Sequence, residues 1–313
     1  MTDLQINASE ALKLAALNES AKDFLLNNPQ LFAVLLKAAK RYIGGENLQE
    51  AIQTAKKFNS AGLPTSLEFM GESISSTNEA NEVTQEFLTL IEAIKKENIT
   101  SIVSLDLSHI GLAVDKELAL DNFKLIAQTA KQSEIDVIIS AEGVERTDEI
   151  IHTFCKISPD FPNVGLTLQA YLYRTPKDLE RILKETQGKI RVVKGAFATP
   201  IGHSIGRGDQ LDDVYINTVE TLLVNNRKCS IATHHDKIQD RVKRLLDKHQ
   251  TPKTNYEFEM LLGIREDLLN DLKKEGYPCR KYIVYGKEWY LYMCNRIAEN
   301  PDNIFQAIID IVM

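Results

Sequence analysis

Hydrophobic spacing divides the chain at about residue 62. Before that point, apolar residues recur every three or four positions, which predicts helices over residues 8–17, 21–26, 31–43 and 48–58. Pro29 and the pair Gly44-Gly45 separate these segments. The pattern therefore predicts an N-terminal helical extension over residues 1–62, followed by a larger domain over residues 63–313.

After residue 62, short apolar runs alternate with polar segments of helical period. There are eight such runs, over residues 65–70, 101–107, 136–141, 165–170, 190–195, 229–233, 255–260 and 280–284. Runs that are apolar on both faces are typical of parallel strands, which helices cover on one side. The alternation predicts an α/β fold of the (β/α)8 TIM-barrel type. A doubly wound open sheet is the alternative, disfavoured because no Gly-x-Gly-x-x-Gly motif follows an early strand.

One predicted connection is long and contains several glycines. Residues 197–212 follow the fifth apolar run and include Gly202, Gly206 and Gly208. A disordered surface loop and a lid or cofactor flap both account for such a segment. The sequence leaves these two interpretations open.

Composition narrows the class of protein. The 313 residues suit one barrel of about 250 residues with an extension. A net charge of −7 argues against a general nucleic-acid binder. The chain has no apolar run near ~20 residues and no signal-like N-terminus, so we expect a cytoplasmic protein without a spanning segment. Its four cysteines lie far apart, which predicts reduced thiols and no metal site.

Polar residues gather at the ends of the predicted strands, where a barrel of this kind holds its site. Examples are Glu142, Lys194, His234 and Glu257. Burying such groups costs several kcal/mol unless they are paired or bound to a ligand. Any one of them can be a structural ion pair, but the set predicts a site for a polar ligand. Lys194 alone is also compatible with a Schiff-base aldolase.

Several blocks at these strand ends resemble the proline dehydrogenase family. They are Arg191-Val192-Val193-Lys194-Gly195-Ala196-Phe197, Ala232-Thr233-His234, and residues 168–175, 258–265 and 279–299. The similarity extends from about residue 67 to residue 303. It implies a barrel that binds FAD, with a final helix over the mouth. It also implies oxidation of a C–N bond by hydride transfer to flavin N5, with a quinone or oxygen as electron acceptor.

The resemblance also implies roles for individual residues. The expected contacts with FAD are Gln169, Arg191, Val193, Lys194, Gly195, Ala196, Thr233, His234 and Glu299. The expected catalytic and substrate-pocket residues are Glu72, Asp106, Ser140, Phe197, Leu261, Tyr282, Asn295 and Arg296. Spacing alone gives Arg296 a plainer role, because Arg296 and Glu299 are three residues apart on a helix and can pair at its surface.

The substrate pocket departs from the family pattern. The family usually binds the proline carboxylate with a lysine on the second strand and two consecutive arginines on the last helix. Here Asp106 replaces the lysine, and Asn295 replaces the first arginine. Ser140 stands where the family has an aspartate, and Phe197 where it has a tyrosine. Together these changes shift the pocket charge by about −2 at neutral pH.

This shift predicts a substrate other than free L-proline. Asp106 would bind a cationic group, while Arg296 would hold a carboxylate or carbonyl. Glu72 would lose the arginine with which the family's gate residue pairs. Two alternatives stay open: an authentic L-proline dehydrogenase that forms 1-pyrroline-5-carboxylate, and a flavin-binding protein without turnover. The sequence does not determine the oligomeric state.

Overall fold

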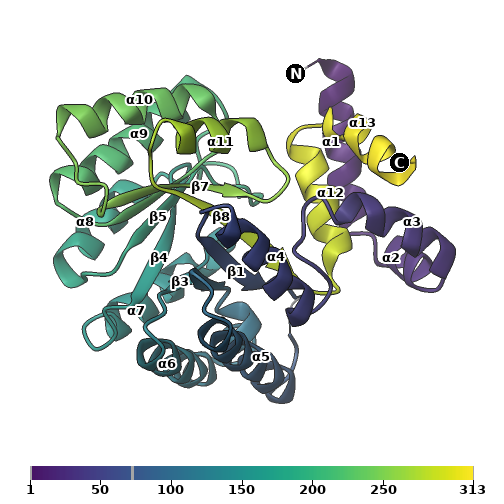
Figure 1. Ribbon diagram of the computed structural model, residues 1–313, viewed down its shortest axis with the longest axis horizontal. Helices are drawn as coiled ribbons and strands as arrows, with labels where there is room; N and C mark the ends of the chain where they lie inside the picture. Colours follow the sequence, from purple (N-terminus) through teal and green to yellow (C-terminus); the bar gives the residue numbers. More distant parts are fainter. Residues whose placement is uncertain (1, 72–73, 313) are drawn as a thin grey trace.

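Parallel strands close into a single barrel (Figure 1). The computed structural model describes residues 2–71 and 74–312. Each strand pairs with the next along the chain, and the last returns to pair with the first. The strands are β1 (Thr65–Phe69), β2 (Ser101–Leu105), β3 (Val137–Ile139), β4 (Val164–Gln169), β5 (Ile190–Val193), β6 (Cys229–Ala232), β7 (Tyr256–Leu261) and β8 (Cys279–Tyr285). The predicted (β/α)8 barrel is confirmed.

Helices follow the strands and cover the outside of the barrel. They are α5 (Thr77–Lys96), α6 (Lys116–Gln132), α7 (Thr147–Ile157), α8 (Thr175–Glu185), α9 (Asp209–Val224), α10 (Asp236–Lys248) and α11 (Glu266–Lys274), with short 3₁₀ turns η1 (Ser108–Ile110) and η2 (Val144–Arg146). Phe87, Phe123, Phe154 and Tyr215, one from each of four helices, are fully buried against the strands. The apolar face of each helix therefore supplies the second half of the core.

A second apolar cluster joins the two ends of the chain. It is formed by α1 (Asp3–Ala16), α2 (Glu19–Leu26), α3 (Pro29–Ala39), α12 (Trp289–Glu299) and α13 (Asn303–Val312). Trp289 is fully buried in it, with its ring 5.0 Å from that of Phe32. Figure 1 shows these helices gathered beside the barrel, with both termini among them. We refer to them as the terminal cluster.

The remaining predicted helix packs differently from its neighbours. α4 (Leu48–Ser60) places Ala51, Ile52 and Ala55 in the barrel core. The division of the chain at residue 62 stays a prediction. By its contacts, α4 belongs with the barrel core, and α12 belongs with the N-terminal helices. None of the helices in residues 2–71 and 74–312 has both the length and the apolar character needed to cross a bilayer.

The long connection after β5 is folded against the barrel rim. The backbone N–H of Ile205 donates to the carbonyl of Tyr171 at 2.7 Å, and that of Tyr173 donates to His203 at 3.2 Å. Ser204 also forms a bridge with Leu172. These contacts favour an ordered segment over a disordered loop, while its role as a flap stays a prediction.

Gly188, just before β5, allows close packing between a turn and a strand. A Cβ atom at this position would lie 2.0 Å from the carbonyl oxygen of Val164. We expect Gly188→Ala to lower the free energy of unfolding by ~1–3 kcal/mol, because the backbone must shift to relieve the clash. Gly206→Ala is the matched control, since no atom lies within 4 Å of a Cβ there. Urea unfolding measures both, and equal midpoints for the two variants would contradict this account.

Candidate active site

The inside of the barrel is polar, and its side chains lie in layers. Side chains alternate between the two faces of a strand, so Ser66 and Glu68 on β1 point the same way. The Ser66 hydroxyl lies 2.8 Å from that of Ser104 on β2, inside the barrel. Counting two residues onward from each serine places Glu68 and Asp106 closer to the mouth, at the carboxyl ends of the strands.

The lower layer, nearest the amino ends of the strands, is centred on Glu257. Its carboxylate accepts hydrogen bonds from Ser230 at 2.7 Å and from Arg280 at 2.9 Å, and it pairs with Lys189. Burial alone would raise the pKa of Glu257, but the charges of Arg280 and Lys189 lower it far below its usual range. The Glu257 carboxylate is thus neutralised by two cations of the protein.

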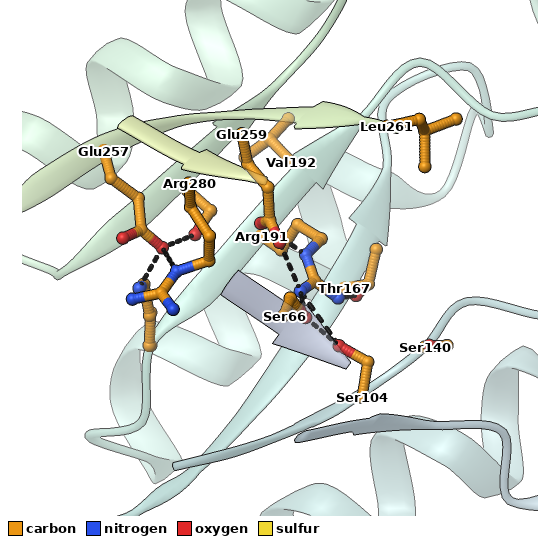
Figure 2. Close-up of polar contacts among 12 residues, drawn as sticks. Ser66, Ser104, Ser140, Thr167, Arg191, Val192, Glu257, Glu259, Leu261 and Arg280 are labelled. Carbon is orange, nitrogen blue, oxygen red and sulfur yellow. Dashed lines mark hydrogen bonds and ion pairs between the residues drawn. The ribbon is translucent and has the colours of Figure 1, made fainter. Parts of the chain in front are cut away.

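The middle layer is centred on Arg191 of β5 and Glu259 of β7 (Figure 2). The two side chains are 3% and 1% exposed and form a two-pronged ion pair, with bonds of 2.7 and 2.8 Å. Arg191 also donates to Ser66 at 3.1 Å and to Ser104 at 3.0 Å. Its guanidinium lies 4.9 Å from the ring centre of Tyr282 on β8. The charge of Arg191 is thus neutralised within the protein.

The upper layer, at the mouth, carries carboxyl groups from three adjacent strand ends: Glu68, Asp106 and Glu142. The Ser140 hydroxyl donates to Glu68 at 3.1 Å. Burial raises the pKa of Glu68 to about 7, although the charge of Arg191 works in the opposite direction. Burial, followed by the charges of Glu68 and Glu142, raises the pKa of Asp106 well above its usual value. The acidic side of the mouth therefore disfavours further negative charge.

The opposite side of the mouth, at the ends of β5 and β6, carries donors. Lys194 donates to Asp212 at 2.5 Å and contacts His235 Nδ1 at 3.1 Å. The Lys194 ammonium is therefore engaged by two side chains of the protein itself. Thr233 is buried and accepts a hydrogen bond from the His235 backbone at 3.2 Å.

His234 has an unused ring nitrogen. Its Nε2 accepts from the Leu261 backbone at 3.4 Å, while Nδ1 is buried and has no partner among the described residues. Burial, followed by the charge of Arg296, lowers the pKa of His234 to about 3, so the ring is neutral at pH 7. A buried nitrogen without a hydrogen-bond partner among the described residues, close to the mouth, is a candidate contact for a ligand.

Gly195 has a packing role that the sequence does not reveal. It adopts a φ of +109°, and a Cβ atom there would lie 2.2 Å from the ring of Tyr171. The Tyr171 ring fills the space that this glycine leaves. The Tyr171 hydroxyl in turn donates to the Phe197 carbonyl at 3.1 Å, while the Phe197 side chain is 47% exposed.

Helix α12 brings further predicted residues to the site. Arg296 pairs with Glu299 at 2.9 Å and lies over Tyr292, 5.0 Å from its ring centre. Its Nε is buried and lacks a partner in the part of the chain that the structure describes. Asn295, next to Arg296, is half-buried. The surface pair of Arg296 and Glu299 therefore exists, and it leaves one donor of the guanidinium unused.

The other predicted residues lie at the strand ends as expected. Gln169 is buried at the end of β4 and donates to the Glu142 carbonyl at 2.8 Å. Val193 ends β5, with Ala196 three residues further along. Glu72 lies outside the described residues. The individual roles of these residues stay predictions.

Two residues of the site, Glu68 and Glu259, are not among those that the sequence predicts for it. Their signal was an acidic residue within an apolar run, two positions from another polar residue on the same face. Only the fold reveals their partners: Ser140 follows β3, two strands from Glu68 on β1, and Arg191 on β5 meets Glu259 on β7.

A closed barrel with convergent polar groups at its carboxyl end defines an enzyme of the (β/α)8 class. A family model described as "Proline dehydrogenase" matches residues 51–306 of this chain. Proline dehydrogenase 1 of Bacillus subtilis (strain 168) is 34% identical over 267 residues, covering 85% of this chain and 87% of that protein. Proline dehydrogenase of Deinococcus radiodurans is 34% identical over 270 residues, with the same two coverages. The chain therefore belongs to the proline dehydrogenase family, whose oxidoreductases generally use FAD.

A solved structure gives independent support for the fold. The crystal structure of proline utilization A from Bdellovibrio bacteriovorus, inactivated by N-propargylglycine, matches with a TM-score of 0.82 at 19% identity. The match covers 94% of this chain and 36% of that one, so this chain spans about a third of the larger protein. At this identity the likeness supports the barrel architecture.

The buried pair of Arg191 and Glu259 leads to a stability prediction. We expect Arg191→Met to cost ~3–5 kcal/mol of unfolding free energy, because it leaves the Glu259 carboxylate buried without a counter-ion. Adding Glu259→Leu should recover most of this loss. Arg241→Met, which breaks an exposed pair with Asp213, is the control and should cost at most ~1 kcal/mol. Denaturant unfolding of the variants would refute the account if Arg191→Met cost no more than Arg241→Met.

Proposed function

We propose that this chain is an FAD-dependent dehydrogenase that oxidises a C–N bond of a cationic amine rather than of free L-proline. The observation that carries the proposal is the group of carboxyls in the upper layer. Among the described residues, the Asp106 side chain has no hydrogen-bond or ion-pair partner. An amine cation would supply the missing positive charge.

The cations near the mouth already have carboxylate partners. Arg191 is held by Glu259, and Arg296 by Glu299. Arg146 lies 3.7 Å from Glu142 and 3.1 Å from Glu145. A free α-carboxylate would therefore enter close to unneutralised acidic groups. Losing one partner of a buried charge pair typically costs ~2–5 kcal/mol, which corresponds to decades in affinity.

The residues present fit a flavin dinucleotide. The unused Nδ1 of His234 and the donors of Lys194 and Thr233 lie on the side of the mouth opposite the acidic groups. With Gln169 at the end of β4, these side chains would hold the cofactor. When bound, FAD supplies a hydride acceptor for the carbon beside the amine nitrogen.

The chain's own residues would bind and orient the amine. The acidic groups of the upper layer would attract its positive charge. The aromatic ring of Tyr282, which already packs against the Arg191 guanidinium, would contact the amine as well. The free Nε of Arg296 would bind a carbonyl or carboxylate of the substrate. The electron acceptor, a quinone or oxygen, and a cytoplasmic location remain predictions.

One alternative has specific support. Relatives named proline dehydrogenases share about a third of their residues with this chain, and Arg296 retains a donor that can receive a carboxylate. An L-proline dehydrogenase that tolerates Asp106 and Asn295 is therefore the second candidate. A flavoprotein without turnover would show a flavin spectrum that no amine bleaches.

The test is an anaerobic visible spectrum of the purified protein, titrated with pyrrolidine or L-proline. Pyrrolidine has the same ring and charged nitrogen but no carboxylate. We expect flavin absorption that pyrrolidine bleaches at lower concentration than L-proline does. Replacing Asp106→Lys together with Asn295→Arg should improve the relative response to L-proline by about a hundredfold or more. If L-proline bleaches the flavin of the unaltered protein at lower concentration than pyrrolidine does, the alternative is favoured. Absence of flavin would refute the cofactor assignment.

A further inference from the structure

Helix α13 is polar on the side that faces the protein and apolar on the side that faces solvent. On the inner side, Asp310 forms a two-pronged ion pair with Arg41, just after α3, with bonds of 2.5 and 2.6 Å. Gln306 also donates to Asp310 at 3.0 Å, and Asn303 donates to the Arg296 carbonyl on α12 at 3.4 Å. These contacts fix the rotation of the helix about its own axis.

The exposed positions of α13 are all apolar. They are Ile304, Phe305, Ile308, Ile309 and Val312, with exposed fractions of 42, 66, 53, 47 and 76%. When a helix packs on one side of a globular protein, its outward positions usually carry charged and polar residues. In α13 this arrangement is reversed, so folding of the described chain leaves an apolar face uncovered. We refer to these five residues as the α13 face.

Exposed apolar side chains are concentrated on the terminal cluster. Of the eighteen large apolar side chains that are exposed in residues 2–71 and 74–312, eleven lie on its five helices. Five of them lie on α13 alone, which is 10 residues long. They present roughly 500 Å² of apolar surface, enough to mark an interaction site. Two such faces would bury about 1,000 Å², the size at which specific protein–protein interfaces begin.

The charges around the α13 face favour a protein partner over a membrane. Helices that lie on a membrane surface are rich in Lys and Arg on their polar side, because these residues attract anionic lipids. The one charged residue of α13 is Asp310, which is engaged by Arg41 on the inner side. The five helices of the terminal cluster hold six acidic residues against four basic ones. A negatively charged membrane would therefore repel this part of the molecule.

The spacing of the α13 face fits a second copy of the same helix. Phe305, Ile308, Ile309 and Val312 are separated by three, one and three positions, a pattern that reads the same in both directions. If a two-fold axis relates two antiparallel copies of α13, then Ile308 and Ile309 lie beside that axis, and Phe305 meets the partner's Val312. All of these side chains are uncharged, so the contact brings no like charges together.

We propose that two copies of this chain associate as a symmetric dimer through the α13 face. The two antiparallel helices bury their apolar residues against each other, which removes from water the surface that folding of a single chain leaves exposed. This association depends on neither the substrate nor the cofactor. Because Asn303 of α13 bonds to the backbone of Arg296, the interface lies one helix away from the mouth of the barrel.

Sedimentation velocity of the full chain at micromolar concentrations measures the association. We expect a species of twice the chain mass of 35.3 kDa, which dissociates on dilution. Ile308→Glu should raise the dissociation constant by about a hundredfold or more, because it places two carboxylates beside the axis. Leu125→Glu is the matched control: Leu125 is 50% exposed on α6, outside the terminal cluster, and its replacement should leave the association unchanged.

A mixed sample tests the two-fold contact itself. Chains with Ile308→Glu and chains with Ile308→Lys should each be monomeric, because each brings two like charges together beside the axis. An equal mixture of the two should recover the dimer, since opposite charges then meet. A variant that had merely lost its fold would not recover in this way, so the mixture separates a broken interface from a broken helix.

Co-sedimentation with vesicles of phosphatidylcholine and phosphatidylglycerol examines the other occupant of such a face. We expect the unaltered protein to stay in solution as a dimer. A monomer at every concentration would overturn the proposal, as would a dimer that Ile308→Glu leaves intact or a charge mixture that stays monomeric. A monomer that binds the vesicles, and loses this binding in Ile308→Glu, would assign the face to a membrane surface instead.

Discussion

Arg191 and Glu259 face each other across the inside of a closed barrel, where branched aliphatic side chains usually pack. Two ions in such a place are tolerated only when their geometry is close and their remaining donors are used. The hydroxyls of Ser66 and Ser104 meet that condition, and Tyr282 packs on the guanidinium. The mouth of the barrel therefore lies directly above the middle layer, a layer of polar side chains whose charges already cancel.

The middle layer determines the electrostatics of the site above it. An arginine bound to its own carboxylate partner offers little net charge to Glu68, Asp106 and Glu142 at the strand ends. Burial and the neighbouring carboxylates raise the pKa of Glu68 and of Asp106, and Arg146 lies beside Glu142 at the rim. On the other side of the mouth, Lys194 and His234 offer donors. The site thus has an acidic half and a donor half, which suits an amine placed beside a flavin.

Local patterns were sufficient to predict the eight strands and most helices, because apolar periodicity directly reflects which faces are buried. They placed strand ends less well: β3 stops at Ile139, so Ser140 lies just beyond it. Helix α1 begins earlier than its apolar spacing suggests, because Thr2 and Gln5 form a capping box. The family resemblance located the mouth residues. It did not reveal the partner of Glu68 or the ring of Tyr171 against Gly195, since these contacts depend on packing between distant segments.

The mouth is shared by two apolar cores. The strand ends belong to the barrel, while Asn295 and Arg296 are carried by α12, whose buried side chains Trp289, Met293 and Ile297 lie in the terminal cluster. Residues of α12 that face the site can therefore change without repacking the barrel, and strand-end residues can change without disturbing the helices. Such a division makes ligand preference separable from folding during evolution. A lineage can inherit the scaffold intact while each core contributes its own substitutions to the pocket.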